Sequence, residues 1–218
     1  MKLMRGNNTS FRADPTGYIS RTAINSVSGF QVAALGAMGR QRVSLLNALG
    51  EGQFDLRNGA QPGGVTFVPS GDYSENGGEQ AISAYWCPFI QGNSEVGSIE
   101  IPAHAPEHSF LFTAAMNGCS LQVVPAPGGR LRVFHNQHPH NANLTNIVTN
   151  QGQREIIAEL NYADYGNEDA AAVSNAFCFM YYTNNRWHLI AQPQTIAADL
   201  SVSINPGIPP VVRPVPDA

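Results

Sequence analysis

The sequence predicts a strand-rich α+β fold, and two observations carry this prediction. The middle of the chain is a series of short apolar and aromatic segments, separated by turns rich in glycine, proline and asparagine. The region before it spaces its apolar residues as a helix does. The 218 residues fit one domain with a sizeable core, and no internal repeat or change of composition indicates a second.

Helices are expected in the N-terminal part. Asp14 and Pro15 form a helix start, with the aspartate as the cap and the proline at the first helical position. Apolar residues from Thr22 to Leu49 follow a helical period, but several glycines interrupt it, so we expect two helices or one broken helix. The two glycines of 50–52 end this region.

Strands are expected through the rest of the chain, and the first two form a hairpin across the turn at 58–64. The expected strands are 54–56, 65–68, 81–89, 98–101, 109–113, 121–124, 131–135, 177–182 and 187–190. Residues 73–80 are expected to be loop, and 154–160 and 168–174 short helices. One domain is thus expected over 1–204, followed by a proline-rich tail, 205–218, that is extended or disordered.

Composition argues against several classes of function. Charged residues make up 13% of the chain, the net charge is −4, and no long basic cluster occurs, so nucleic-acid binding is not expected. No run of 18 apolar residues occurs, so no membrane span is expected. The N-terminus lacks the apolar segment of a classical signal peptide. A monomer is expected.

The three cysteines, Cys87, Cys119 and Cys178, are an odd number at wide spacing. Such a set is no disulfide framework, and it favours a reducing compartment. Lys2 is the only lysine among twelve cationic residues. Two explanations stay open: the base composition of the genome, or avoidance of ubiquitination by a protein that acts inside a foreign eukaryotic cell.

A candidate catalytic group lies between residues 112 and 135. Cys119 follows Gly118, Thr113 precedes the cysteine by six positions, and His135 lies sixteen positions after it. A thiol nucleophile needs a base that takes its proton, and histidine is suited to this. Gly118 permits a tight turn that aims backbone amides at a developing oxyanion, and the Asn117 amide can add a donor.

Structural roles compete with this interpretation. A free cysteine is most often a small buried apolar residue, and we expect this of Cys87 and Cys178 in their aromatic segments. Cys119 has less apolar neighbours. The histidines at 135, 138 and 140 lie close together, but their spacing matches no zinc pattern, so no metal is expected.

The arrangement resembles the bacterial glutamine deamidases, which include cytotoxic necrotizing factor, the chemotaxis receptor deamidases and Burkholderia lethal factor. The resemblance rests on Phe112-Thr113, Met116-Asn117-Gly118-Cys119 and Val133-Phe134-His135, and is closest to the lethal factor. That protein has Leu-Ser before the Gly-Cys and a shorter loop between cysteine and histidine. The resemblance implies a β-sandwich core flanked by helices.

The resemblance also implies a mechanism and a setting. Cys119 would be the nucleophile that attacks a glutamine carboxamide of a host protein, His135 the general base and Thr113 the third site residue. Gly118 and Asn117 would form the oxyanion pocket, and this mechanism would require no metal and no cofactor. The protein would be made in the bacterial cytoplasm, released, and act as a toxin in the host cytosol, on a translation initiation helicase or a Rho-type GTPase.

Three alternatives stay open. The same cysteine and histidine would serve a protease, which cleaves its target, or a transglutaminase, which incorporates a primary amine. The third alternative is a non-catalytic β-sandwich binding module that uses its polar, asparagine-rich surface. In that case the thiol of Cys119 has no chemical role.

Overall fold

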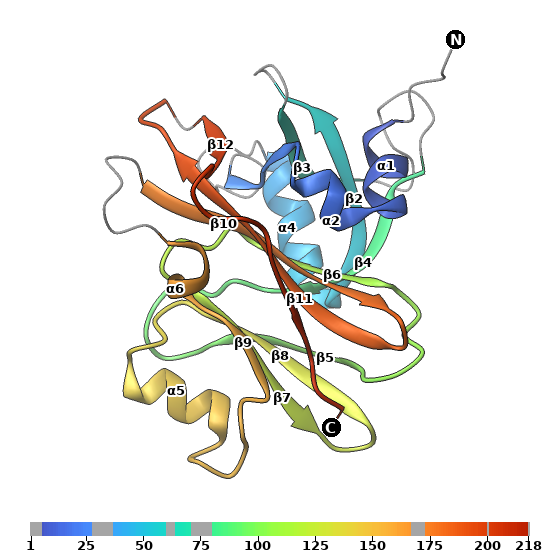
Figure 1. Ribbon diagram of the computed structural model, residues 1–218. Coiled ribbons are helices and arrows are strands. Elements are labelled where there is room, and N and C mark those ends of the chain that lie inside the picture. The colour runs from blue at the N-terminus through green and yellow to red at the C-terminus, as the bar shows by residue number, and fades with distance from the viewer. Residues whose placement is uncertain are drawn as a thin grey trace.

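The computed structural model describes residues 6–27, 37–59, 64–70, 80–166, 173–199 and 201–217. They form a nine-stranded sheet and a four-stranded sheet, with the helices at the periphery (Figure 1). A sheet-dominated α+β fold is therefore confirmed. In Figure 1 the large sheet occupies the upper part of the molecule and the small sheet the lower part.

Five helices occur in the described chain, and caps mark two of the predicted helix ends. The helices are α1 (Asn7–Ala13), α2 (Pro15–Ile19), α4 (Ala37–Leu49), α5 (Ala142–Thr149) and α6 (Tyr162–Tyr165). The Asp14 side chain accepts a hydrogen bond from the Gly17 amide at 2.8 Å, which confirms the predicted start of α2. Gly50, at φ 73°, follows α4 and donates its amide to Leu46. The predicted end of that helix is therefore also confirmed.

Two sheets contain all the strands of the described chain. The strands are β1 (Ala23–Asn25), β2 (Glu51–Asn58), β3 (Gly64–Ser70), β4 (Ile82–Cys87), β5 (Gly97–Pro102), β6 (Phe110–Thr113), β7 (Ser120–Ala126), β8 (Arg130–Asn136), β9 (Ala158–Leu160), β10 (Val173–Thr183), β11 (Arg186–Ile196), β12 (Val202–Ile204) and β13 (Val211–Pro214). The large sheet has the order β1-β3-β2-β4-β6-β10-β11-β12, with β13 also paired to β11. The small sheet has the order β5-β8-β7-β9.

Each predicted strand occurs with its ends shifted, and β2 and β3 pair antiparallel as the predicted hairpin requires. Two helix predictions are wrong. Residues 158–160 form β9, because they complete the edge of the small sheet against β7. Residues 23–25, within the predicted helical region, form β1, because the fully buried Ile24 pairs in parallel with β3.

Parts of four predictions of local structure lie outside the described residues. They are residues 28–36 of the helical region, 60–63 of the expected turn 58–64, 73–79 of the expected loop, and 168–172 of the expected helix 168–174. The last two residues of that expected helix, 173 and 174, begin β10 instead. The α1, α5 and α6 helices and the strands β12 and β13 were not predicted.

The large sheet curls around an aromatic core. Two glutamine side chains of β11, here called the glutamine seam, connect β11 to β1 and to the residues just before it. Gln192 of β11 accepts from the Ile24 amide at 3.0 Å and donates to the carbonyls of Ile19 and Thr22. Gln194 donates to the Ile24 carbonyl at 2.8 Å. The enclosed aromatic rings include Phe11, Phe54, Phe67, Phe112, Phe177 and Phe179. Hydrogen bonds from these two glutamine side chains, instead of a ladder of backbone hydrogen bonds, thus connect β1 to β11.

The other face of the large sheet packs on the small sheet. This inter-sheet core contains Tyr85, Leu111, Met180 and Leu189 from the large sheet, and Ile101, Leu121, Val133 and Leu160 from the small one. Cys87, Cys119 and Cys178 all belong to it, and all three are free thiols. The structural role expected for Cys87 and Cys178 is confirmed by their complete burial.

The C-terminal tail is tied to the molecule in the described residues 201–217. Strand β13 pairs antiparallel with the middle of β11 and runs down beside it toward the small sheet (Figure 1). Arg213 forms an ion pair with Asp164 at 2.8 Å and donates to the Glu159 carbonyl. Val215 is 2% exposed. Residues 211–214 of the tail are thus extended.

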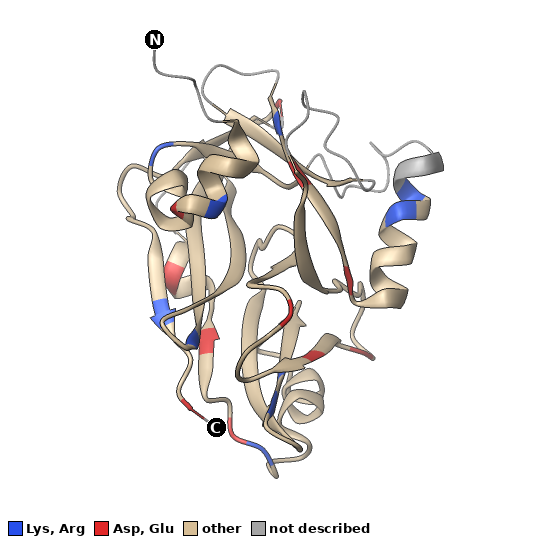
Figure 2. Cartoon of the chain, turned by 90° about the vertical axis from the view of Figure 1, so that its right-hand side faces the viewer, with Lys and Arg blue, Asp and Glu red and all other residues tan. Residues whose placement is uncertain are grey.

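Charged residues are sparse and spread over several elements, as Figure 2 shows for the described part of the chain. Among the described helices, none is long and apolar enough to cross a membrane.

Candidate functional site

A hydrogen bond between a threonine and a histidine joins the two sheets. Thr113 ends β6 of the large sheet, and His135 lies next to the end of β8 in the small sheet. Thr113 Oγ1 lies 2.6 Å from His135 Nδ1 and donates to the Cys87 carbonyl at 2.8 Å. Both side chains are fully buried. The two sheets thus bring together residues 22 positions apart in the sequence.

These contacts fix the tautomer of the histidine. The Thr113 hydroxyl has one proton, and it donates this proton in the hydrogen bond to the Cys87 carbonyl. The hydroxyl oxygen must therefore accept the Nδ1–H of His135, which leaves a lone pair on Nε2. Burial lowers the pKa of His135 from 6.5 to about 4, because it penalises the charged imidazolium. His135 is therefore a neutral ring with an unprotonated Nε2 at pH 7.

Cys119 lies on the same face of the small sheet as His135, but the two are not hydrogen-bonded. Leu121 of β7 is the cross-strand neighbour of His135, and Cys119 precedes it by two residues. Alternate residues of a strand share a face, so Cys119 is the diagonal neighbour of the histidine. The Cys119 thiol instead makes a long contact of 4.0 Å to the Asn117 carbonyl, and His135 Nε2 has no partner in the described structure.

The thiols of the inter-sheet core are held neutral. Burial raises the pKa of Cys119, and a backbone hydrogen bond at Asn117 only partly offsets this effect. Burial also raises the pKa of the fully buried Cys87 and Cys178. Cys119 is 7% exposed. A thiolate–imidazolium pair, the usual ground state of an activated cysteine, does not form in this arrangement.

Gly118 and Asn117 form the turn that leads into β7. Gly118 has φ 80°, a conformation that favours glycine, as the tight turn predicted at this position requires. The exposed Asn117 lines a cavity of about 280 Å³, together with Ala114, Ala115 and Phe89. The Phe89 ring lies edge-on to the His135 ring, with centroids 5.1 Å apart. Phe89 thus lines this cavity and packs against the histidine.

Sequence reasoning missed two residues of this region. Tyr165 of α6 donates its hydroxyl to the Cys119 carbonyl at 2.8 Å and fixes the backbone there. Phe89 covers His135. Both lie far from the motif in the sequence, and only the folded chain places them beside it. The described residues contain no group of three or more histidine, cysteine or acidic side chains able to hold a metal ion.

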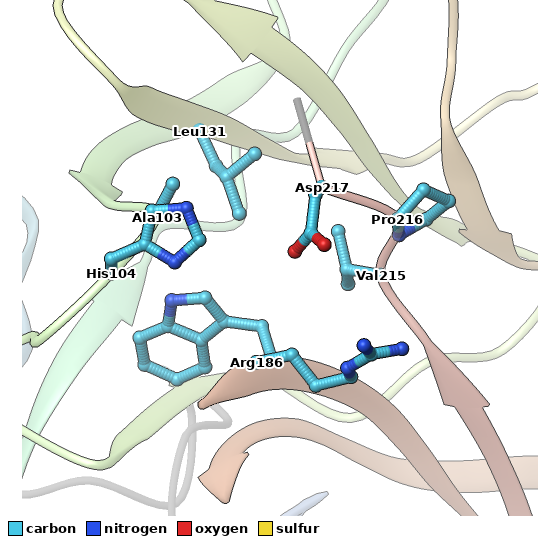
Figure 3. A pocket seen from close by; sticks show the side chains of 8 residues that line it. Ala103, His104, Leu131, Arg186, Val215, Pro216 and Asp217 are labelled. Carbon is cyan, nitrogen blue, oxygen red and sulfur yellow. The ribbon is translucent and has the colours of Figure 1, made fainter. Parts of the chain in front are cut away.

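A separate small cavity lies under the C-terminal tail. The His104 ring lies on one side, and Val215 and the Asp217 carboxylate face it from the tail (Figure 3). Trp187 also lines this cavity. Its volume of about 10 Å³ is the space of one water molecule, so it admits no larger ligand. The Trp187 indole donates to the Pro102 carbonyl at 2.9 Å, which links the large sheet to β5.

Fold and site together define a sheet-dominated α+β domain with cysteine, histidine and threonine side chains enclosed between its two sheets. The chain belongs to the family of the Mcf1 activator-binding domain, whose family model matches residues 7–205. The matched region includes both sheets up to β12, and β13 follows it. No curated protein matches the chain.

Proposed function

We propose that this domain binds another protein and serves as the docking module for an activator. The observation that carries this proposal is the family match, which spans residues 7–205 and is named for activator binding. It favours the binding module over the catalytic alternatives of the sequence analysis. The partner is recognised by the folded surface of the domain.

The state of the enclosed cluster supports this proposal. Cys119 is 7% exposed and His135 is fully buried, so neither presents a reactive atom to a macromolecule in solution. Burial keeps both groups neutral. In a binding module these side chains stabilise the packing of the sheets, and Thr113 satisfies two buried polar groups at their junction.

Capture of partners from a eukaryotic cell lysate tests the proposal. The domain is immobilised, retained proteins are quantified by mass spectrometry, and an excess of free domain is used as the competitor. A binding module retains a partner that the free domain displaces, and Cys119→Ser retains the same partner equally. Retention of no displaceable protein would contradict the proposal.

A second candidate, a glutamine deamidase, is favoured by the orientation of His135. Thr113 holds the Nδ1–H, so Nε2 is the proton acceptor that a general base needs, and Cys119 is its diagonal neighbour. In this proposal a rotation of Phe89 opens the histidine to the adjacent cavity. The finer fold assignment, a deamidase-type β-sandwich like that of the necrotizing factor, belongs to the same proposal.

The chemistry of this second candidate is acyl transfer. The thiol proton of Cys119 passes to His135 Nε2 while the sulfur bonds to the carboxamide carbon of a partner's glutamine. Ammonia leaves with that proton, a thioester remains, and water releases glutamate and restores the thiol. In this proposal backbone amides at Gly118 and the Asn117 side chain stabilise the oxyanion. The setting is the host cytosol after release from a bacterium.

Mass spectrometry of the same lysate separates the two candidates. A deamidase converts a specific glutamine to glutamate with the wild type and not with Cys119→Ser. Cleavage of the partner would indicate a protease, and incorporation of an added primary amine a transglutaminase. If the wild type changes no protein while the partner is still retained, the second candidate is excluded and the first stands.

A further inference from the structure

A cavity of about 480 Å³ lies on the outer face of the small sheet, between α5 and α6. Its lining includes Ser120 and Gln122 of β7, Glu159 of β9 and Tyr162 of α6. Side chains alternate along a strand, so these β7 residues face away from Cys119 and Leu121. The cavity is therefore on the opposite side of the sheet from the cysteine and histidine.

A chain of amide hydrogen bonds holds one carboxylate in this cavity. Asn136 Nδ2 donates to Gln122 Oε1 at 3.1 Å, and Gln122 Nε2 donates to Glu159 Oε1 at 2.8 Å. Asn136 is fully buried and Gln122 is 3% exposed. The carboxylate is thereby fixed in position, while its second oxygen, Oε2, has no partner among the described residues.

The charge of Glu159 is not neutralised by a cation of the described chain. The neighbouring carboxylate, Asp164, is paired with Arg213 at 2.8 Å. The same guanidinium reaches the backbone carbonyl of Glu159, not its side chain. The described lining contains His140 but no lysine or arginine, so the Glu159 carboxylate is its permanent charge and the cavity is suited to a cation and not to a phosphate or another anion.

Two further groups favour a cationic ligand with hydrogen-bond donors. Ser120 is fully buried, and its Oγ has no hydrogen-bond partner among the described residues, so the lining contains an unsatisfied acceptor in addition to the carboxylate. Tyr162 contributes an aromatic ring to the lining, and such a ring attracts a cation over its face. A guanidinium combines positive charge, several N–H donors and a planar face in one group.

We propose that this cavity receives an arginine side chain of the partner protein. Glu159 Oε2 accepts its N–H groups, Ser120 Oγ accepts a further one, and the Tyr162 ring lies against its plane. The source of the arginine rests on the proposed function, since it comes from the docked protein. The affinity of the cavity for a guanidinium rests only on the residues that line it.

Titration of the free domain with N-acetyl-arginine amide tests the proposal without any partner. Binding is followed by the amide NMR signals of Ser120, Glu159 and Tyr162. The neutral isostere N-acetyl-citrulline amide is the matched ligand. We expect saturable shifts with the arginine compound and at least about tenfold weaker binding with the citrulline compound, since one charge-assisted hydrogen bond accounts for about that factor.

The variants Glu159→Gln and Ser120→Ala complete the test. Glu159→Gln retains an acceptor for Gln122, so the fold is kept, and it should weaken arginine binding at least about tenfold. Ser120→Ala should weaken it less. Equal binding of the arginine and citrulline compounds, shifts outside this cavity, or no shifts at all would each overturn the proposal. The capture experiment does not depend on this titration. A failure of the cavity to bind arginine can therefore be distinguished from a failure of the domain to bind a partner protein.

Discussion

Thr113 and His135 are joined by a hydrogen bond of 2.6 Å between Oγ1 and Nδ1, and each comes from a different sheet. The same hydroxyl satisfies the carbonyl of Cys87 at the end of β4. One buried hydroxyl therefore links three strands and sets the tautomer of the histidine. This relationship serves either proposed function: it stabilises the junction of the sheets, and it leaves His135 Nε2 unprotonated.

Replacement of Thr113 by valine should destabilise the domain. The change keeps the side-chain volume but leaves the Cys87 carbonyl and His135 Nδ1 buried without partners, at a cost of about 1–3 kcal/mol. Urea unfolding measures the loss, and ¹⁵N NMR of the ring reports the loss of a single tautomer. Thr113→Ser keeps the hydroxyl and is the control. Equal stability of the valine and serine variants would contradict this account.

The stability of the domain should fall on acidification through the titration of His135. Its pKa is 6.5 in the unfolded chain and about 4 in the fold, so the unfolded state binds the proton first as the pH drops. The stability present above pH 6.5 should decrease by about 3 kcal/mol on approach to pH 4. His135→Gln should remove this part of the pH dependence. Parallel stability profiles for both proteins would show that the histidine is not held neutral.

The three thiols should differ in reactivity with iodoacetamide. Cys119 is 7% exposed and the other two are fully buried, so Cys119 should be modified first, and Cys87 and Cys178 only after unfolding. Because burial raises the pKa of Cys119, its alkylation at pH 7 should be at least about tenfold slower than in urea. Peptide mass spectrometry gives the rates. Faster reaction in the folded protein would indicate an activated thiolate and favour the deamidase.

The glutamine seam of the large sheet should contribute strongly to stability. Gln192→Leu leaves the amide of Ile24 and the carbonyls of Ile19 and Thr22 without this partner, so we expect a loss of about 2–4 kcal/mol. The control is Gln53→Leu, since Gln53 is partly exposed and its side chain bonds to the Ser83 hydroxyl and to no other side chain of the described residues. Denaturant unfolding of both variants tests this, and equal losses would contradict the role of the seam.

The strands were largely predictable because their apolar residues and turns are local features. β4, β6, β7 and β8 were expected close to their observed positions. β1 and β9 were not, because each is three residues long and is held by distant partners. Gln192 reaches β1 from 168 positions away, and no local pattern records such a contact.

The sequence indicates which residues form the candidate site, but it does not indicate their burial or their protonation. Thr113, Cys119 and His135 stand out by type and spacing, and the fold places all three in or beside the inter-sheet core. Their burial was not predictable, because Phe89 and Tyr165 enclose the site from other parts of the chain. Burial decides the pKa values, and these decide whether the thiol is activated.

The affinity of the captured partner for the wild type and for Cys119→Ser tests the central claim most directly. Isothermal titration calorimetry of the purified pair gives both dissociation constants, and mass spectrometry of the partner follows each titration. The account predicts saturable binding, equal dissociation constants for the two proteins, and an unchanged partner. No measurable binding by either protein would contradict it.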